Sequence, residues 1–236
     1  MKLSRLVLLA AVVAALLLLV AGPGTRMQWW DFRTGFTLMK YATFVGVGAA
    51  ALALIGLLVP KLRRSGAGLL VLALVMGLAV AYVPWQGMRT AKSVPPIHDI
   101  STDTDQPPPF VEVMPLRADA SNPSVYPGAE VAVQQRAAYP DLQPLRLEVG
   151  TEVAFDRALD AAKAMGWEIV SADRTEGRIE ATDTTLWFGF KDDVVVRVQA
   201  EGGASVIDVR SVSRVGQSDV GKNAQRIRQY LGKIQG

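Results

Sequence analysis

The sequence has no cysteine and only one histidine, His98, among 236 residues. Without cysteine the chain forms no disulfide and offers no thiolate nucleophile, iron–sulfur ligand or cysteine zinc site. A single histidine excludes a site with several histidine ligands from one chain. The acids of "HDISTDTD" (98–105) lack the spacing, the glycine and the terminal glutamate of a calcium-binding loop. We therefore expect no metal and no cofactor.

Acidic residues are almost missing from the first part of the sequence. Residues 1–97 contain ten basic side chains and one acid, Asp31, whereas residues 98–236 contain fifteen basic and twenty-one acidic side chains. A chain that is basic overall would suggest nucleic acid if its charge were evenly spread. Here the basic groups flank apolar segments and the remainder is acidic. We therefore expect no nucleic-acid partner.

Charged residues are absent from three long apolar stretches, 6–22, 41–59 and 66–85. Each approaches the roughly 20 residues that cross the hydrocarbon core of a bilayer, and none has the polar stripe of a soluble helix. They predict a transmembrane region over residues 1–90, with an uncleaved anchor favoured over a signal peptide for the first stretch. Glycine and alanine recur in the second and third stretches and allow close helix packing. The lack of charge disfavours a transporter.

The basic loop "PKLRRSG" (60–66) and the basic N-terminus predict that both lie in the cytoplasm. Three spans then place the C-terminal half outside. We expect a multi-pass protein of the bacterial inner membrane with a periplasmic, extracytoplasmic domain. Its expected partners are the lipid bilayer and either a membrane protein or a bound lipid.

Residues 91–142 are rich in proline, aspartate and serine, which predicts extended or turned chain, either a flexible linker or a strap lying over the domain. Residues 143–236 predict the domain itself. "TEVAFDRALDAAKAMGW" (151–167) has the period of an amphipathic helix with Thr151 as its N-cap. Four strand patterns follow, and a last helix is expected to begin at an N-cap Ser218.

This order predicts an α+β fold: three transmembrane helices, then a two-layer domain with an antiparallel sheet covered on one face by two helices. Alternation along the strands predicts which residues are buried. The positions expected in the core are Val194, Val196, Val198, Ile207 and Val209. Those expected on the opposite face are Glu180, Arg197, Asp208, Arg210 and Arg214.

Four blocks, "PPIHDISTDTDQPP", "YPDLQPL", "GFKDDVVVRV" and "DVRSVSRVGQSDVGKNAQRIR", together resemble domain-of-unknown-function family 1499. The resemblance covers roughly residues 92–235. Membrane segments ahead of such a domain are similar to a common bacterial arrangement, and related domains occur in plants. The resemblance supports the domain boundary and implies no reaction.

"RSVSRVGQSDVGKN" (210–223) holds the strongest ligand-binding candidates. The guanidinium groups of Arg210 and Arg214 could bind a carboxylate or phosphate through paired hydrogen bonds. Such an anion would lie beside the N-terminus of the last helix, with Asp219 and Asn223 nearby. The alternative is architectural, because the arginines can pair with acids such as Asp208 and Glu180. We favour the architectural interpretation.

Two further sites are candidates. His98 and Asp99 could bind a ligand, or act as acid and base beside Ser211 or Ser213. Trp187 and Phe188, in the turn "LWFGF" (186–190), are candidates for membrane contact, although such a turn can also close the end of the sheet.

The leading hypothesis for function is non-enzymatic: a membrane-anchored envelope protein whose outer domain binds a lipid, an anionic ligand or a partner protein. One alternative is a structural subunit of a larger membrane complex. The other is a hydrolase-like enzyme that uses His98 with nearby acids.

Overall fold

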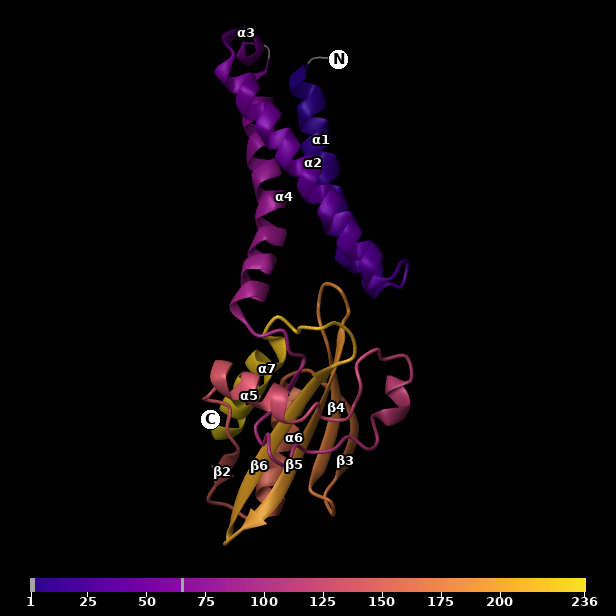
Figure 1. The fold of residues 1–236 in the computed structure, drawn as a ribbon, viewed down its shortest axis with the longest axis vertical. Helices are drawn as coiled ribbons and strands as arrows, with labels where there is room; N and C mark the ends of the chain where they lie inside the picture. Colours follow the sequence, from indigo (N-terminus) through magenta and orange to yellow (C-terminus); the bar gives the residue numbers. More distant parts are fainter. Residues whose placement is uncertain (1–2, 65) are drawn as a thin grey trace. The chain divides into compact units, whose positions relative to one another are not determined.

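The computed structural model describes residues 3–64 and 66–236, and its elements are labelled in Figure 1. The chain divides into two compact units. One comprises residues 1–90 together with 186–189, and the other comprises residues 91–185 and 190–236.

The first unit contains three long apolar helices, α1 (Leu3–Arg26), α2 (Phe32–Leu58) and α4 (Ala67–Ser93), with a short helix α3 (Pro60–Arg63) between the last two. All three are long and apolar enough to cross a membrane. They cover residues 6–22, 41–58 and 67–85 of the three apolar stretches and continue into polar residues at several ends. The Asp31 carboxylate caps α2 by accepting hydrogen bonds from the backbone N–H groups of Arg33 and Thr34.

Small residues let α2 and α4 approach closely. A Cβ atom added to Gly77 would lie only 2.4 Å from the carbonyl oxygen of Gly46, and 3.0 Å from the Cβ of Ala50. Only glycine fits such a contact between backbones, as the glycine-rich pattern predicted.

The second unit is built on an antiparallel sheet. Its strands are β1 (Asp99–Ser101), β2 (Leu145–Leu147), β3 (Glu168–Asp173), β4 (Arg178–Thr184), β5 (Lys191–Glu201) and β6 (Ala204–Ser213). They lie in the order β1-β6-β5-β4-β3, and β2 also pairs with β6. The predicted α+β class and antiparallel sheet are confirmed. Strand β1 and a helix α5 (Ala129–Ala138) lie in the stretch whose composition predicted extended or turned chain.

Helices α6 (Thr151–Ala164) and α7 (Lys222–Gln235) pack on one face of the sheet. The valines and isoleucines that alternation predicted, including Val196 and Val209, are buried there against Ala158 and Ile227. Tyr230 of α7 is fully buried. Its ring stacks on Trp167 at 4.8 Å, and its hydroxyl donates to the carbonyl of Ala158.

Both predicted N-caps are wrong. Thr151 is the first residue of α6, and Gly150 takes the N-cap position. Helix α7 begins four residues after Ser218, because Gly221, with φ 77°, ends an intervening turn and occupies the N-cap. Glycine adopts this left-handed conformation without the steric cost that other residues meet.

The opposite face of the sheet is covered by residues 102–128, called the strap below. The strap has little regular structure beyond a single turn of 3₁₀ helix, η1 (Met114–Arg117). Its buried Phe110 and Val113 pack on Val195 of β5 and Val212 of β6. The domain therefore has a helix layer, a sheet and an irregular layer.

Candidate functional site

Arg210 of β6 lies on the strap face and is bonded on all sides. Its guanidinium donates to both carboxylate oxygens of Asp99, at 2.9 and 2.8 Å, and to the carbonyl oxygens of Pro108 and Ser124. The aromatic rings of Phe110 and Tyr126 lie against it, at 5.1 and 5.5 Å. Burial raises the pKa of the Asp99 carboxyl, and the hydrogen bonds from Arg210 oppose that rise. Arg210 is therefore committed to partners within the domain.

Arg214 is committed in the same way, but to a different acid. It donates to both carboxylate oxygens of Asp193, at 2.9 and 2.8 Å, and to the carbonyl of Leu116 at 2.6 Å. Asp193 also receives hydrogen bonds from Arg117 and Thr182. Two arginines thus share one fully buried carboxylate.

The predicted partners of these arginines, Asp208 and Glu180, are wrong. Asp208 pairs with its cross-strand neighbour Arg197 at 2.8 Å. The Glu180 carboxylate accepts backbone N–H groups from three consecutive strap residues, 111–113, at 2.9 to 3.1 Å. The strap brings partners that are distant in sequence, so strand alternation could place these side chains on a face but could not pair them.

Asp219 and Asn223 organise the turn that leads into α7. The Asp219 carboxylate accepts from the backbone N–H groups of Gly221 and Asn223 at 2.7 and 2.8 Å. Burial raises the pKa of Asp219, and the same hydrogen bonds oppose the rise. The Asn223 amide donates to the carbonyl of His98 at 2.9 Å and accepts from Ser211 at 2.8 Å. Asp219 thus shapes the turn, and Asn223 joins α7 to β6 and to the residue that precedes β1.

Arg226 of α7 is a buried site residue that the sequence reasoning missed. It pairs with Asp183 at 2.7 Å and with Asp192 at 2.5 Å, and it donates to Ser211 and Asn223. Its spacing of three residues from Asn223, on the face that carries Ile227 and Tyr230, was the available signal.

The adjacent acids Asp192 and Asp193 point to opposite faces of β5, as the strand pattern predicted. Asp192 meets Arg226 under the helices, and Asp193 meets Arg117 and Arg214 under the strap. They do not form an acid–base pair.

His98 lies at the edge of an open groove of about 470 Å³. Its ring Nδ1 is 3.2 Å from the carbonyl oxygen of Gln217. The groove is lined by Pro96, Ile97, His98, Asp99, Pro127, Glu130, Val131, Gln134 and Gln217. The hydroxyls of Ser211 and Ser213 instead bond to Asn223 in the interior, at 2.8 and 3.1 Å. The two serines proposed as nucleophiles are therefore engaged away from the groove.

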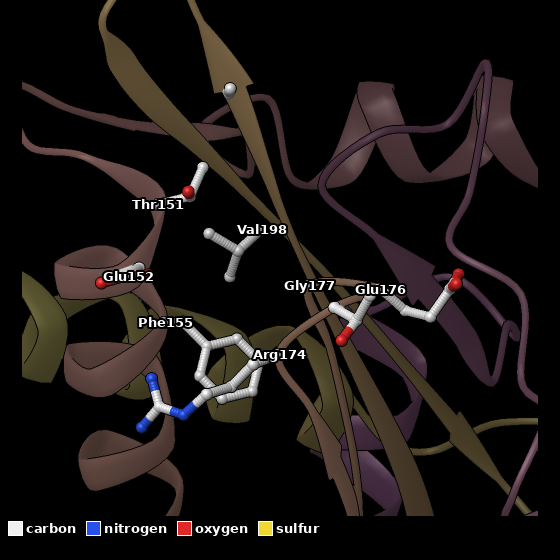
Figure 2. A pocket seen from close by; sticks show the side chains of 9 residues that line it. Thr151, Glu152, Phe155, Arg174, Glu176, Gly177 and Val198 are labelled. Carbon is white, nitrogen blue, oxygen red and sulfur yellow. The ribbon is translucent and has the colours of Figure 1, made fainter.

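A second, smaller cavity of about 280 Å³ lies between the start of α6 and the β3–β4 turn. Figure 2 shows Arg174 extended along the ring of Phe155, with Thr151 and Glu152 on the helix and Glu176 on the turn. The Arg174 guanidinium lies 5.0 Å from the Phe155 ring and pairs with Asp156 of α6. No sequence pattern pointed to this cavity.

The membrane-contact candidates Trp187 and Phe188 lie in the six-residue loop between β4 and β5. Residues 186–189 of this loop belong to the compact unit that contains the apolar helices. Leu186 beside them is 88 % exposed, the highest value among the exposed large hydrophobic side chains of the described residues. The sequence reasoning did not single out Leu186.

A comparison with curated proteins finds no match. A family model does match residues 99–234, from the first residue of β1 into the last turn of α7. This range contains the whole sheet, the strap and the buried arginine pairs, and it excludes the three apolar helices. The chain therefore belongs to the family described as protein of unknown function (DUF1499).

Proposed function

We propose that the chain is a membrane-anchored binding protein whose outer domain holds a polypeptide segment of a partner protein in the groove at His98. The proposal rests on one observation: the candidate arginines already have partners within the domain, whereas the groove does not have its lining covered. Arg210 and Arg214 are occupied by Asp99, Asp193 and strap carbonyls, whereas the groove is open.

The chemistry of the lining favours a peptide over an anionic ligand. Pro96, Ile97, Pro127 and Val131 give an apolar wall, and such walls carry most of a ligand's contact area. Gln134 and Gln217 offer side-chain amides, which can donate to and accept from a peptide backbone.

Charge in the groove is negative. Glu130 is exposed, whereas the charge of Asp99 is offset by Arg210. A segment with a lysine or arginine near Glu130 is the occupant that this charge favours, and a phosphate or an anionic lipid headgroup is disfavoured.

Photo-crosslinking of the full chain in cells tests this proposal. A benzophenone amino acid at position 131 or 134 should give one discrete protein adduct. The same probe at the exposed position 160 on α6 is the control and should give none. Glu130→Lys should weaken the adduct without lowering the melting temperature, because Glu130 is exposed. Equal labelling at 134 and 160, or an adduct with lipid alone, would contradict the proposal.

A thermal melt tests the disfavoured anion site. Phosphate should leave the melting temperature of the full chain in detergent unchanged. A rise that both Arg210→Met and Arg214→Met abolish would mean that these arginines hold an anion.

We further propose that the protein belongs to a bacterial inner membrane with this domain on the periplasmic side. The proposal rests on the basic loop at 60–66 between two apolar helices. Alkaline phosphatase fused to the C-terminus should be active, and green fluorescent protein fused there through the same export route should be dark. Bright fluorescence without phosphatase activity would reverse the orientation.

A further inference from the structure

The loop between β4 and β5 is a well-built hairpin tip with an apolar surface. The backbone N–H of Thr185 donates to the carbonyl of Phe190, and the N–H of Phe190 donates to the Thr185 hydroxyl, each at 2.8 Å. Gly189, with φ 70°, completes the turn. This closed base presents Leu186, which is 88 % exposed, and Trp187, which is 36 % exposed. Single exposed apolar residues are ordinary, but a leucine and a tryptophan exposed side by side at the end of a hairpin form a concentrated apolar surface.

Strand register shows which end of the sheet carries this tip. The last pair of the hairpin is Thr184 with Lys191, and the next residue, Asp192, pairs with Ser213 of β6. Asp99, the first residue of β1, pairs with the neighbouring Val212. The tip therefore extends from the end of the sheet at which the chain enters the domain.

The chain enters directly from an apolar helix. Helix α4 ends at Ser93 and β1 begins at Asp99. The intervening residues can span no more than about 20 Å, since an extended residue covers roughly 3.5 Å. Because this linker is short, anchoring of the chain through α4 keeps the end of the sheet that carries Leu186 close to the membrane. Residues 186–189 also fall in the compact unit of the apolar helices.

Exposed positive charge surrounds the same end. Lys92 lies in the last turn of α4, Lys191 at the base of the hairpin and Lys222 at the start of α7, and all three are exposed. Within the described part of the chain, none of the three forms an ion pair. Asp192, Asp193 and Asp219, three acids of this end, are buried and bonded within the domain. A tip with Leu and Trp, at an end of the sheet that also carries exposed lysines, has the chemistry that anionic headgroups and the membrane interface attract.

We propose that this hairpin tip, with Leu186 and Trp187 at its centre, inserts into the headgroup region of the membrane that anchors the chain. The insertion gives the outer domain a second attachment beside the covalent one and fixes which end of the sheet faces the lipid. This inference is independent of the peptide groove, since the groove is lined by other residues.

The absence of cysteine makes a direct test possible. Leu186→Cys introduces a single thiol into the full chain, which is labelled with an environment-sensitive fluorophore and reconstituted in phosphatidylcholine vesicles with and without phosphatidylglycerol. Thr175→Cys is the matched control, because Thr175 is an exposed turn residue at the opposite end of the sheet. Brominated lipids should quench the label at 186 several times more strongly than the label at 175.

Charge variants sharpen the result. Lys191→Glu and Lys222→Glu should reduce the quenching at 186 in vesicles with phosphatidylglycerol and change it little in pure phosphatidylcholine. A water-like emission at 186 that brominated lipid does not quench would overturn the proposal. A blue-shifted emission without quenching would also overturn it, because the tip would then be buried in protein.

Discussion

The two faces of the sheet are covered in different ways, and the chemistry of each face follows from its cover. Under α6 and α7 the strands present mainly valine and isoleucine, which meet Phe155, Ile227 and Tyr230. Under the strap the same strands present charged side chains, with a small apolar cluster around Val113. Alternation along β5 and β6 separates the two sets residue by residue.

The difference arises from backbone hydrogen bonding. A helix satisfies its own N–H and C=O groups, so it can cover a face with apolar contacts alone. An irregular segment cannot, and each of its buried backbone groups needs a partner from elsewhere. The Glu180 carboxylate accepts hydrogen bonds from three backbone N–H groups of the strap. Arg210 and Arg214 donate hydrogen bonds to backbone carbonyls of the strap. The buried charges supply the bonds that regular structure would have supplied.

Breaking an ion pair under the strap should give the largest loss of stability. Arg210→Met leaves Asp99 buried without its partner and leaves two strap carbonyls unpaired. Removing one member of a buried pair costs about 3–5 kcal/mol. We expect a loss of this size in the free energy of unfolding, measured by urea titration of the full chain in detergent.

The double variant Asp99→Asn with Arg210→Met is the control for that prediction. It removes the uncompensated charge and should recover part of the loss. If the single variant lost less than about 1 kcal/mol, as for an exposed pair, Arg210 would not be holding the strap.

On the helix face the dominant cost should be a cavity. Ile227 is fully buried against the sheet. Ile227→Ala removes apolar contacts and should cost about 2–5 kcal/mol, and we expect a value near the middle of that range. Hydrogen exchange measured by mass spectrometry should show that the strap amides lose no more protection than global unfolding of the variant accounts for. Selective loss of protection in the strap would mean that the two faces are not independent.

A smaller and more local effect is expected from Glu180→Gln. The glutamine has one carbonyl oxygen where the carboxylate used two to accept the N–H groups of residues 111–113. Each buried donor left without an acceptor costs about 1–3 kcal/mol. Exchange of the amides of Val111 and Val113 should accelerate, whereas Val196 in the middle of β5 should keep its protection. Uniform acceleration across the sheet would contradict a local role.

The helix face was more predictable from sequence than the strap face for the same reason. Regular structure repeats along the chain, so apolar residues recur every second position in a strand and every three to four positions in a helix. These repeats predicted that Val194, Val196 and Val209 are buried, and they predicted helix α6. The pairs Arg210–Asp99 and Arg214–Asp193 join distant segments with no repeat to reveal them. Composition indicated extended or turned chain across 91–142 and gave no sign that Gln135 of α5 would bond both backbone groups of Ser101. The candidate residues of 210–223 were found, but their partners required the structure.

The smallest predicted effect is a pH dependence at the turn into α7, where Asp219 is buried. Burial raises its pKa above the ordinary value of 3.8, although the N–H groups of Gly221 and Asn223 oppose the rise. As pH rises from about 3.8, the unfolded chain loses the Asp219 proton before the folded chain does, so this group favours unfolding increasingly until the pH passes its folded pKa. Asp219→Asn cannot ionise and lacks this term. The deficit of the variant, which is the free energy of unfolding of the wild type minus that of the variant, should therefore be largest at about pH 3.5. It should fall as pH rises through the folded pKa, because all other acids contribute equally to both chains. Urea titrations of wild type and variant across this range measure the difference. A deficit that widens with pH would mean that the two backbone hydrogen bonds outweigh burial and that the pKa of Asp219 is lowered.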